Sequence, residues 1–365
     1  MLAVLSGGGT AGHINPALAL ADVLSDRGCD VRFAGTPRGV EARLVPAAGV
    51  PFTAFEASGF NRNHPTTIVS GVAKIAKSTK AAKKWFREIG PDVVVGFGGY
   101  VSIPVARAAE SMGIPVVVHE QNSVMGMANR YLAKRAAAVC VTYEGTADGV
   151  CDPRIVHVTG NPVRASVLAA RREEGRAMLG IPDEARMLLV FGGSLGARHI
   201  NEAVAALKDE LLSRPDVHVV HITGPKELDA VTEALALTEE EAQRWHLMGY
   251  QDRMGETLAA ADAIVSRAGA TSLAEISARA IPALLIPFPY ATEDHQTTNA
   301  RAYVEAGCAY MLPDAEVMGG EFRVKVLALI DDADVRAAMS AAARARKTAD
   351  AAANLADVVM AAARA

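Results

Sequence analysis

The chain has 365 residues, of which 50% are hydrophobic and 21% are charged, and its formal net charge is −4. At about 150 residues per domain, this length favours two domains, and the hydrophobic content argues against global disorder. The small negative charge gives no indication of nucleic acid as a partner. The cysteines (Cys29, Cys140, Cys151 and Cys308) form no C-x-x-C pair. Their scatter favours reduced thiols in a cytoplasmic protein over a disulfide or zinc framework.

The first residues, 1–7, are apolar without a basic start, so they predict a buried strand rather than a signal peptide. No apolar stretch approaches the roughly 20 residues that cross a bilayer. We therefore expect a protein that is soluble or bound to a membrane only at its surface.

Short apolar runs alternate with helical stretches along the chain. The runs are residues 31–34, 93–95, 115–118, 138–141, 187–191, 217–222, 263–265 and 283–286. The helices expected between them include residues 12–27, 101–111, 197–213, 271–279 and 296–306. Continuous apolar strands joined by helical crossovers predict an α/β protein with parallel sheets that are covered on both faces.

Three glycine-rich turns each lie between an expected strand and helix: residues 7–13 (GGGTAGH), 96–100 (GFGGY) and 192–196 (GGSLG). Such turns direct backbone N–H groups at one point, which attracts phosphate. Two of them lie about half a chain apart, which favours two similar domains around a shared phosphorylated ligand. Each turn alone is also compatible with a plain connection from strand to helix.

The first turn resembles a dinucleotide site, but that site needs an acidic residue at the end of the second strand. Here the nearest acid, Asp30, begins that strand, so the sequence disfavours NAD. His13 follows the glycines at a helix start, where an imidazole can act as a general base. A capping or structural histidine is the alternative that the residues leave open.

Polar side chains also follow later strands. His119, Glu120 and Asn122 follow one strand, and the first two could serve acid–base chemistry. Glu275 could accept both ribose hydroxyls of a nucleotide, although its spacing from Ser272 also fits a capping box, which the spacing alone favours. The loop at 287–300 offers hydrogen-bonding side chains for a sugar, or is simply the polar start of a helix.

Residues 62–88 carry seven basic residues and one acid, with an apolar stripe and a Trp-Phe pair near the end. A basic amphipathic helix of this kind suits an anionic membrane surface, and a solvated helix face is the alternative. The sequence contains no H-E-x-x-H motif, G-x-S-x-G elbow or P-loop lysine, and it predicts neither a metal nor a cofactor.

Taken in order, six motifs resemble the MurG family, the bacterial N-acetylglucosaminyltransferases that convert lipid I to lipid II. They are GGTAGH (8–13), GFGGYVS (96–102), HEQN (119–122), GNPVR (160–164), GGSxGAR (192–198) and RxGAxS…E (267–275). The resemblance implies a GT-B fold, with two Rossmann-like domains whose parallel sheets face a central cleft. The first would span residues 1–163, with a C-terminal helix at about 343–365 packing back on it, and the second residues 164–342.

The resemblance also implies a donor, UDP-N-acetylglucosamine, with Ser194 on a phosphate, Glu275 on the ribose and Gln251 near the uracil. Arg164 would lie on the nucleotide side, and Gln296 would bond the sugar. The full set of implied donor-binding residues is Thr10, Ala11, Gly12, Asn122, Arg164, Ser194, Gln251, Ala270, Thr271, Ser272, Glu275, His295 and Gln296.

The implied acceptor is lipid I, with its diphosphate on Gly9, Gly98, Gly99 and Tyr100. The muramyl C4 hydroxyl would displace UDP with inversion, and His13 would be the general base, with Glu120 and His119 as alternatives. The membrane surface would comprise Ile68, Val72, Ile75, Lys74, Lys77, Lys80 and Trp85. The protein would then be peripheral, at the cytoplasmic face of the anionic inner membrane. A UDP-N-acetylglucosamine 2-epimerase and a non-enzymatic, membrane-associated nucleotide-sugar-binding module are the competing functions.

Overall fold

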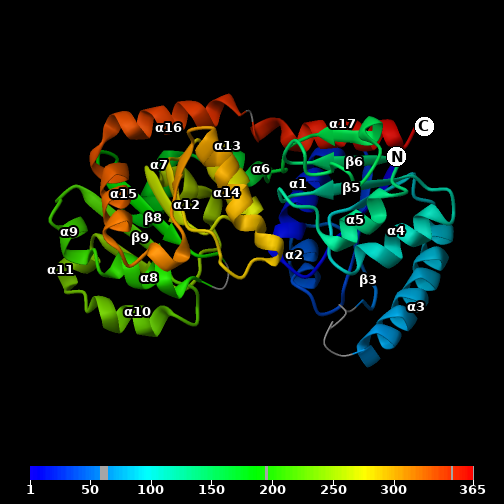
Figure 1. The fold of residues 1–365 in the computed structure, drawn as a ribbon, viewed down its shortest axis with the longest axis horizontal. Coiled ribbons are helices and arrows are strands. Elements are labelled where there is room, and N and C mark those ends of the chain that lie inside the picture. The colour runs from blue at the N-terminus through cyan, green and yellow to red at the C-terminus, as the bar shows by residue number, and fades with distance from the viewer. Residues whose placement is uncertain (58–64, 194–195, 347, 365) are drawn as a thin grey trace. The chain divides into compact units, whose positions relative to one another are not determined.

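The computed structural model describes residues 1–57, 65–193, 196–346 and 348–364, and it gives the backbone alone for 65–72 and 348. The chain divides into two compact units (Figure 1). The first comprises Met1–Arg164 together with Ala349–Ala365, and the second comprises Ala165–Thr348. Each unit is built on one parallel sheet, as the alternation of apolar strands and helices predicts.

The first unit contains a seven-stranded sheet in the order β3-β2-β1-β4-β5-β6-β7. Its strands are β1 (Leu2–Ser6), β2 (Asp30–Gly35), β3 (Phe52–Ala54), β4 (Val93–Gly96), β5 (Val116–Glu120), β6 (Ala138–Val141) and β7 (Val156–Val158). Its helices are α1 (Ala11–Asp26), α2 (Glu41–Ala47), α3 (Pro65–Ile89), α4 (Ser102–Glu110), α5 (Met127–Ala133) and α17 (Ala351–Ala362), with short 3-10 turns at Pro153–Ile155 and Thr348–Asp350.

Alternate residues of a strand point to opposite faces of its sheet, and β1 shows how this builds two cores. Ala3 and Leu5 pack with residues of α1 and α17, such as Leu355. Val4 packs on the other face with residues of α3 and α4, including Phe86. Both faces are therefore buried, which explains why these strands are apolar without interruption.

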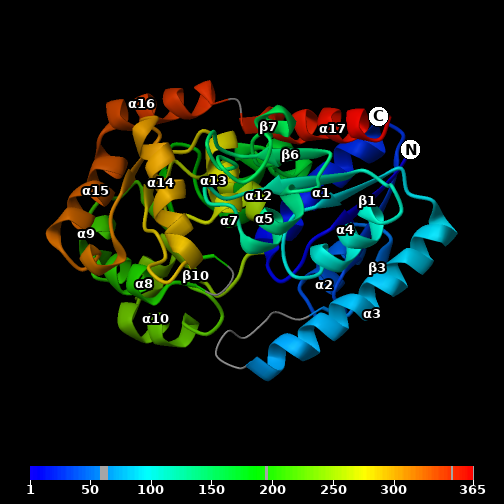
Figure 2. The same cartoon turned by 45° about the vertical axis from the view of Figure 1, so that its right-hand side comes forward.

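Helix α17 follows the whole second unit in the chain, yet it packs against α1 in the first (Figures 1 and 2). Leu355 and Val359 are fully buried there, and Arg27, directly after α1, forms an ion pair with Asp357 at 2.6 Å. The apolar face of this C-terminal helix is thus covered by the first unit.

The second unit contains a six-stranded sheet in the order β10-β9-β8-β11-β12-β13. Its strands are β8 (Arg186–Phe191), β9 (Val217–Ile222), β10 (Trp245–Met248), β11 (Ala263–Ser266), β12 (Ala283–Leu285) and β13 (Ala309–Met311). Its helices are α6 (Ala165–Ala169), α7 (Arg172–Leu179), α8 (Arg198–Ala205), α9 (Lys208–Leu212), α10 (Leu228–Leu235), α11 (Glu239–Ala242), α12 (Met254–Ala260), α13 (Ala270–Ala278), α14 (His295–Glu305), α15 (Gly320–Asp331) and α16 (Ala333–Ala345), with 3-10 turns at Thr292–Asp294 and Asp314–Glu316.

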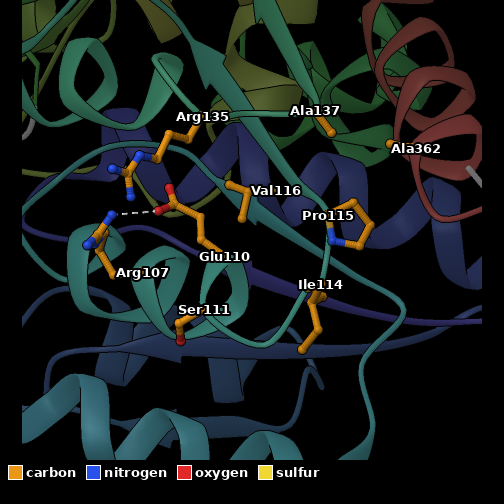
Figure 3. A pocket seen from close by; sticks show the side chains of 10 residues that line it. Arg107, Glu110, Ser111, Ile114, Pro115, Val116, Arg135, Ala137 and Ala362 are labelled. Carbon is orange, nitrogen blue, oxygen red and sulfur yellow. Dashed lines mark hydrogen bonds and ion pairs between the residues drawn. The ribbon is translucent and has the colours of Figure 1, made fainter.

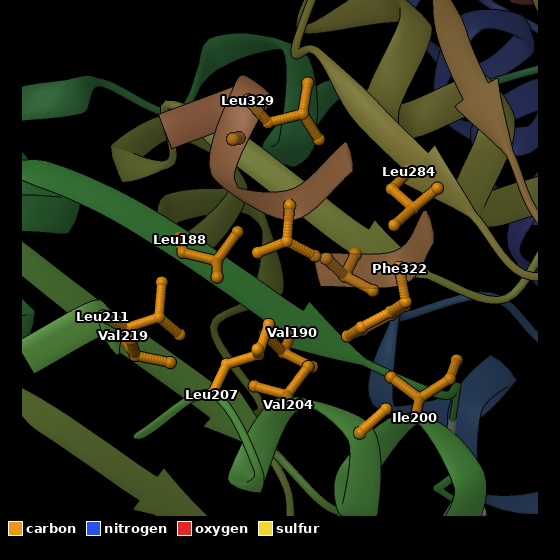
Figure 4. Close-up of a cluster of buried hydrophobic side chains, with 14 of the residues drawn as sticks. Leu188, Val190, Ile200, Val204, Leu207, Leu211, Val219, Leu284, Phe322 and Leu329 are labelled. Atoms are coloured by element: carbon orange, nitrogen blue, oxygen red, sulfur yellow. The ribbon is translucent and has the colours of Figure 1, made fainter. Parts of the chain in front are cut away.

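The core of the second unit is a cluster of apolar side chains between its sheet and the helices on one face (Figure 4). Leu188 and Val190 of β8 meet Val204 of α8 and Phe322 of α15 there. The helix expected over residues 197–213 is instead two helices, α8 and α9, since the helix is interrupted at residues 206–207. The strands not predicted, β3, β7, β10 and β13, have only three or four residues each.

Candidate active site

The first two glycine turns lie at the carboxyl ends of β1 and β4, which are neighbours in the sheet. The strand order reverses between them, since β2 and β3 lie on one side and β5 to β7 on the other. Ligands of open α/β sheets bind at this kind of position. A side chain on Gly99 would place its Cβ 2.5 Å from the carbonyl oxygen of Gly8, so the turns approach backbone to backbone. Gly9, Gly98 and Gly99 also have positive φ angles (89°, 99° and 79°), which glycine adopts without strain. Glycine is thus required here both by space and by conformation.

His13 lies between these turns, in the first turn of α1. Its Nδ1 is 2.8 Å from the carbonyl oxygen of Gly8. A carbonyl only accepts hydrogen bonds, so Nδ1 carries a proton and donates it. In the neutral ring, Nε2 then keeps its lone pair, and it faces Gly98, on which a Cβ would lie 3.2 Å away. The ring is therefore oriented with a basic nitrogen directed at the second turn.

His119 and Glu120, the alternative bases, are buried at the end of β5 and fully engaged by the protein. His119 Nε2 is 2.9 Å from the carbonyl oxygen of Gly160, and its Nδ1 is 3.1 Å from Gln121 Nε2. Burial lowers the pKa of His119 to about 4. With both nitrogens bonded inside the protein, this ring lacks a free atom for an incoming hydroxyl.

The Glu120 carboxylate organises the loop that follows β5. It accepts hydrogen bonds from the backbone N–H groups of Asn122 and Gly126, both at 3.0 Å, and from the side-chain amides of Asn122 and Asn129, at 3.2 and 2.8 Å. Asn122 is therefore held in place by Glu120. The geometry favours a role in positioning for Glu120, and it leaves His13 as the better-placed base.

Glu41, which the sequence did not single out, lies beneath the first turn. Its side chain is buried at the start of α2 and accepts a hydrogen bond from the N–H of Gly9 at 3.2 Å. That N–H is thus already satisfied, which argues against its direct use on an acceptor diphosphate. The Thr10 side chain, at the N-cap of α1, makes no capping hydrogen bond to that helix. The sequence feature that could have indicated Glu41 is the G-x-E pattern at residues 39–41, at the start of a helix.

Arg164 is paired within the first unit. Its Nε lies 3.0 Å from Asp22 Oδ2 on α1. This contact fixes the guanidinium at the end of the first unit's main segment.

In the second unit, the third glycine turn leads from β8 into α8. Gly193 and Gly196 have φ angles of 89° and 81°, and a Cβ on Gly196 would overlap the carbonyl of Thr223. Ser194, predicted to contact a phosphate, lies outside the described residues.

Glu275 lies one turn into α13, a helix that begins at Ala270 with Gly269 at its N-cap. The capping box with Ser272 is therefore wrong, because Ser272 is inside the helix rather than at its cap. No other described residue hydrogen-bonds to the Glu275 carboxylate, and desolvation raises its pKa to about 7. A desolvated carboxylate without a protein partner is well placed to accept hydrogen bonds from a ligand's hydroxyls.

Gln296, at the start of α14, is held with its amide NH₂ available. Its Oε1 accepts from the backbone N–H groups of Ala268 at 3.2 Å and Phe288 at 3.0 Å, which join the ends of β11 and β12. The neighbouring His295 donates from Nδ1 to the carbonyl of Thr292 at 2.7 Å. These contacts orient both side chains at the carboxyl edge of the sheet.

Arg267 is a further residue of this edge that the sequence left without a role. Its Nη1 lies 2.5 Å from Asp314 Oδ1 and also donates to the carbonyls of Ile286 and Pro287. It therefore ties the end of β11 to the loops that follow β12 and β13. Only the fold reveals this bond, because Arg267 and Asp314 are 47 residues apart.

Gln251 follows β10 in the same unit. Its Oε1 accepts from the N–H of Arg253 at 2.9 Å, and its amide lies 3.5 Å from Met248 Sδ. The Gln251 side chain thus stabilises the loop that follows β10 by bonding to residues on both sides of it.

A hollow of about 790 Å³ lies between α3, α4 and α5 in the first unit. Its wall includes Ile75 and Lys80 of α3, together with Tyr100, Met127 and Tyr131, whose side chains are exposed. The hollow thus joins the predicted membrane helix to the second glycine turn.

The expected membrane surface needs one correction. Trp85 packs on Phe55 and Phe86, with ring centroids 5.5 Å apart in both pairs, and it belongs to the edge of the core. Its ring is therefore not a free anchor. For Ile68 and Val72, the side chains lie outside the described residues.

A second hollow of about 490 Å³ lies at the opposite, amino-terminal end of β5, beside Pro115 and Val116 (Figure 3). Arg107 and Glu110 form an ion pair at its rim. This hollow is remote from the carboxyl ends of the strands, and we assign it no part in the site.

Among the residues that the structure describes, no three His, Cys, Asp or Glu side chains are grouped to bind a metal ion. Over the same residues, no helix is both long and apolar enough to pass through a membrane.

Comparison with known families gives the class of the protein. Residues 3–141 match the glycosyltransferase family 28 N-terminal domain, and residues 187–355 match the C-terminal domain of the same family. The chain belongs to glycosyltransferase family 28, and its two units have the α/β architecture of GT-B enzymes.

Relatives within this class share one name. The proteins of Leuconostoc mesenteroides (43% identity over 87% of each chain) and Bacillus licheniformis (38% over 98% of each chain) are both called UDP-N-acetylglucosamine–N-acetylmuramyl-(pentapeptide) pyrophosphoryl-undecaprenol N-acetylglucosamine transferase. Among solved structures, MurG of Acinetobacter baumannii is similar, with a TM-score of 0.75 and 28% identity over 98% of this chain and 99% of that one.

A UDP-N-acetylglucosamine 2-epimerase from Listeria monocytogenes, described as putative, also shares the fold. Its TM-score is 0.71 at 16% identity, over 96% of this chain and 94% of that one. This likeness concerns the fold alone.

Proposed function

We propose that the protein transfers N-acetylglucosamine from UDP-N-acetylglucosamine to the C4 hydroxyl of the muramyl sugar of lipid I, forming lipid II and UDP in peptidoglycan synthesis. The observation that carries this proposal is the 38–43% identity, over most of the chain, to relatives named for that transfer. The arrangement of the residues at the two sheet edges supports it.

The donor binds the second unit. Glu275 accepts hydrogen bonds from the ribose hydroxyls, and this is supported by its lack of a partner among the described residues and by its raised pKa. Gln296 donates its free amide to the sugar, since its Oε1 is already fixed by two backbone N–H groups. The starts of α13, at Ala270 and Thr271, and of α8, at Arg198, offer backbone N–H groups to the diphosphate.

The acceptor binds the first unit, with its diphosphate beside Gly98, Gly99 and Tyr100. The muramyl C4 oxygen attacks the anomeric carbon of the donor while the bond from that carbon to the UDP oxygen breaks. His13 Nε2 takes the hydroxyl proton, and UDP leaves with the electron pair, so the α-linked donor gives a β-linked product. The bond between His13 Nδ1 and Gly8 supports this role because it leaves Nε2 unprotonated in the neutral ring.

The negative charge that develops on UDP is stabilised by backbone N–H groups at helix starts, each contributing about 3 kcal/mol. A divalent ion is not needed for this step in our proposal.

The protein works as a peripheral protein at the cytoplasmic face of the cell membrane. The hollow between α3, α4 and α5 supports this proposal, because it combines exposed Tyr131 and Met127 with Lys80 and lies beside Tyr100. Lys74 and Lys77 extend the positive charge along α3 toward anionic lipid.

The test is transfer of labelled N-acetylglucosamine from UDP to a lipid I analogue. We expect labelled lipid II and an equal amount of UDP. If the donor alone is instead converted to the 2-epimer, the protein is an epimerase. If the donor binds and neither product forms, it is a binding module, and the proposed function is wrong.

A further inference from the structure

One peptide group of the first glycine turn is bonded at both ends to an ionisable side chain. Its carbonyl, that of Gly8, accepts from His13 Nδ1 at 2.8 Å. Its N–H, that of Gly9, donates to Glu41 Oε2 at 3.2 Å. A single peptide therefore connects a carboxylate to the imidazole that we propose as the base.

The protein builds a closed compartment around this carboxylate. Glu41 is fully buried, and its other oxygen accepts from Thr36 N at 3.0 Å and from Thr36 Oγ1 at 2.6 Å. The three donors are neutral, and no described Lys, Arg or His pairs with Glu41. Burying an ionised carboxylate without a cation is costly, so its donors must compensate.

Three glycines make room for the Glu41 side chain. A Cβ on Gly8 would lie 2.6 Å from Glu41 Oε1, and one on Gly35 would lie 2.6 Å from its Cγ. A Cβ on Gly39 would overlap the carboxyl group itself. The backbone of the catalytic turn, at Gly8, is therefore packed directly against Glu41 as well as hydrogen-bonded to it.

A carboxylate that accepts from a peptide N–H polarises that peptide, and hydrogen bonds in a chain strengthen one another. Polarisation makes the Gly8 oxygen a stronger acceptor for His13 Nδ1. The acid of a Ser-His-Asp triad acts similarly, because it fixes the tautomer of its histidine and stabilises the imidazolium by direct contact.

We propose that Glu41 is a positioning residue for proton transfer, acting on His13 through the Gly8–Gly9 peptide. It holds the ring with Nδ1 protonated and Nε2 free, and it stabilises the imidazolium that forms when Nε2 accepts the hydroxyl proton. This assignment rests on the proposed function for its role in the reaction, whereas the coupling of the two side chains can be measured without any substrate.

The direct test is ¹⁵N NMR of protein labelled at histidine, with the His13 signal assigned by its loss in His13→Ala. We expect the Nδ1–H tautomer in the natural protein and a shift of the His13 nitrogen signals toward the Nε2–H form in Glu41→Gln. Glu110→Gln is the matched control, since it makes the same chemical change on α4, where the carboxylate pairs with Arg107. His13 signals that are identical in Glu41→Gln and the natural protein would overturn the proposal.

A second variant guards against failure of Glu41→Gln to fold. Thr36→Ala removes the 2.6 Å hydrogen bond to Glu41 and keeps the charge. It should move the His13 signals in the same direction by a smaller amount. An unchanged spectrum in a folded Thr36→Ala contradicts the inference, and so does an Nε2–H tautomer in the natural protein.

Kinetics supply the link to the reaction. Glu41→Gln should lower kcat about 10- to 100-fold, the equivalent of one hydrogen bond to a charged group, with the donor KM retained. In a His13→Ala background the same change should have less than a roughly twofold effect, since coupled residues are not additive. Fully additive losses would show that Glu41 does not act through His13. A natural protein that transfers no sugar refutes the proposed function instead, and the NMR result still decides the coupling.

Discussion

The two units treat the carboxylates near their sheet edges in opposite ways. In the first unit, Glu41 and Glu120 lie beside the glycine turns, and both carboxylates accept hydrogen bonds from protein donors at each of their oxygens. In the second unit, Glu275 has no partner among the described residues, and its pKa is raised to about 7 by desolvation. A carboxylate whose hydrogen bonds are satisfied by the protein fixes the conformation of the nearby backbone, whereas one without protein partners can accept hydrogen bonds from a ligand.

The largest effect should come from His13, which we propose as the base and which the first glycine turn orients. His13→Ala should lower kcat about 10²- to 10⁴-fold, because general-base catalysis contributes that much, with little change in the donor KM. Steady-state kinetics with a lipid I analogue measures this. His199→Ala is the control, because His199 lies in the first turn of the corresponding helix α8 but pairs with Asp314 at 2.6 Å. Equal losses of kcat in His13→Ala and His199→Ala would contradict a specific role of His13 as the base.

The unpaired acid should govern donor binding. Glu275→Gln should raise the donor KM about 10- to 100-fold, since two hydroxyl donors lose a charged acceptor, and should leave kcat within a few-fold. In the natural protein the donor KM should also rise as the pH falls below about 7, because Glu275 becomes protonated. That pH dependence should disappear in Glu275→Gln. A donor KM that is flat from pH 8 to pH 6 in the natural protein argues against contact with Glu275.

Charge reversal on α3 tests the membrane surface. Each lysine near an anionic bilayer contributes about 1 kcal/mol, so Lys77→Glu with Lys80→Glu should weaken binding to phosphatidylglycerol vesicles by at least about 30-fold. Vesicle co-sedimentation at low salt measures this, and 0.5 M salt should abolish the difference. Lys226→Glu in the second unit is the matched control. Vesicle binding that is insensitive to both lysines would favour a solvated helix face.

The smallest effect concerns stability. The pKa of Glu275 is raised in the folded protein above its ordinary value, so the folded state binds more protons between about pH 4.5 and pH 7. This contribution to stability is complete at low pH and is lost as the pH rises through about 7. At pH 8, Glu275→Gln should therefore have a free energy of unfolding about 1–2 kcal/mol larger than that of the natural protein, and hence a higher unfolding temperature, whereas the difference should be smaller at pH 5. Thermal unfolding at both values checks the sign.

The sequence predicted the sheets well because their central strands are apolar throughout and their turns carry glycine. The edge strands β3, β7, β10 and β13 escaped prediction because they are short and only partly buried, so polar residues such as Thr53, His157 and His246 interrupt three of them. The break between α8 and α9 was also missed, because alanine and leucine continue through it.

At the site, the glycine turns and His13 could be located from spacing alone. The partners of each side chain could not. Glu41 reaches Gly9 across 32 residues, and Arg267 reaches Asp314 across 47, and only the fold brings such pairs together. The same limit explains why Trp85 looked exposed, although its ring packs on Phe55 across 30 positions of the sequence.

The return of α17 to the first unit has a consequence for biosynthesis. The ribosome releases α1 early, but the residues that cover its apolar face, Leu355 and Val359, emerge only after the entire second unit. Until then the nascent first unit exposes an apolar surface on α1, which promotes aggregation or binding by chaperones. The two units therefore cannot complete their folding one after the other in chain order, because the first unit needs α17, which is synthesised after the second.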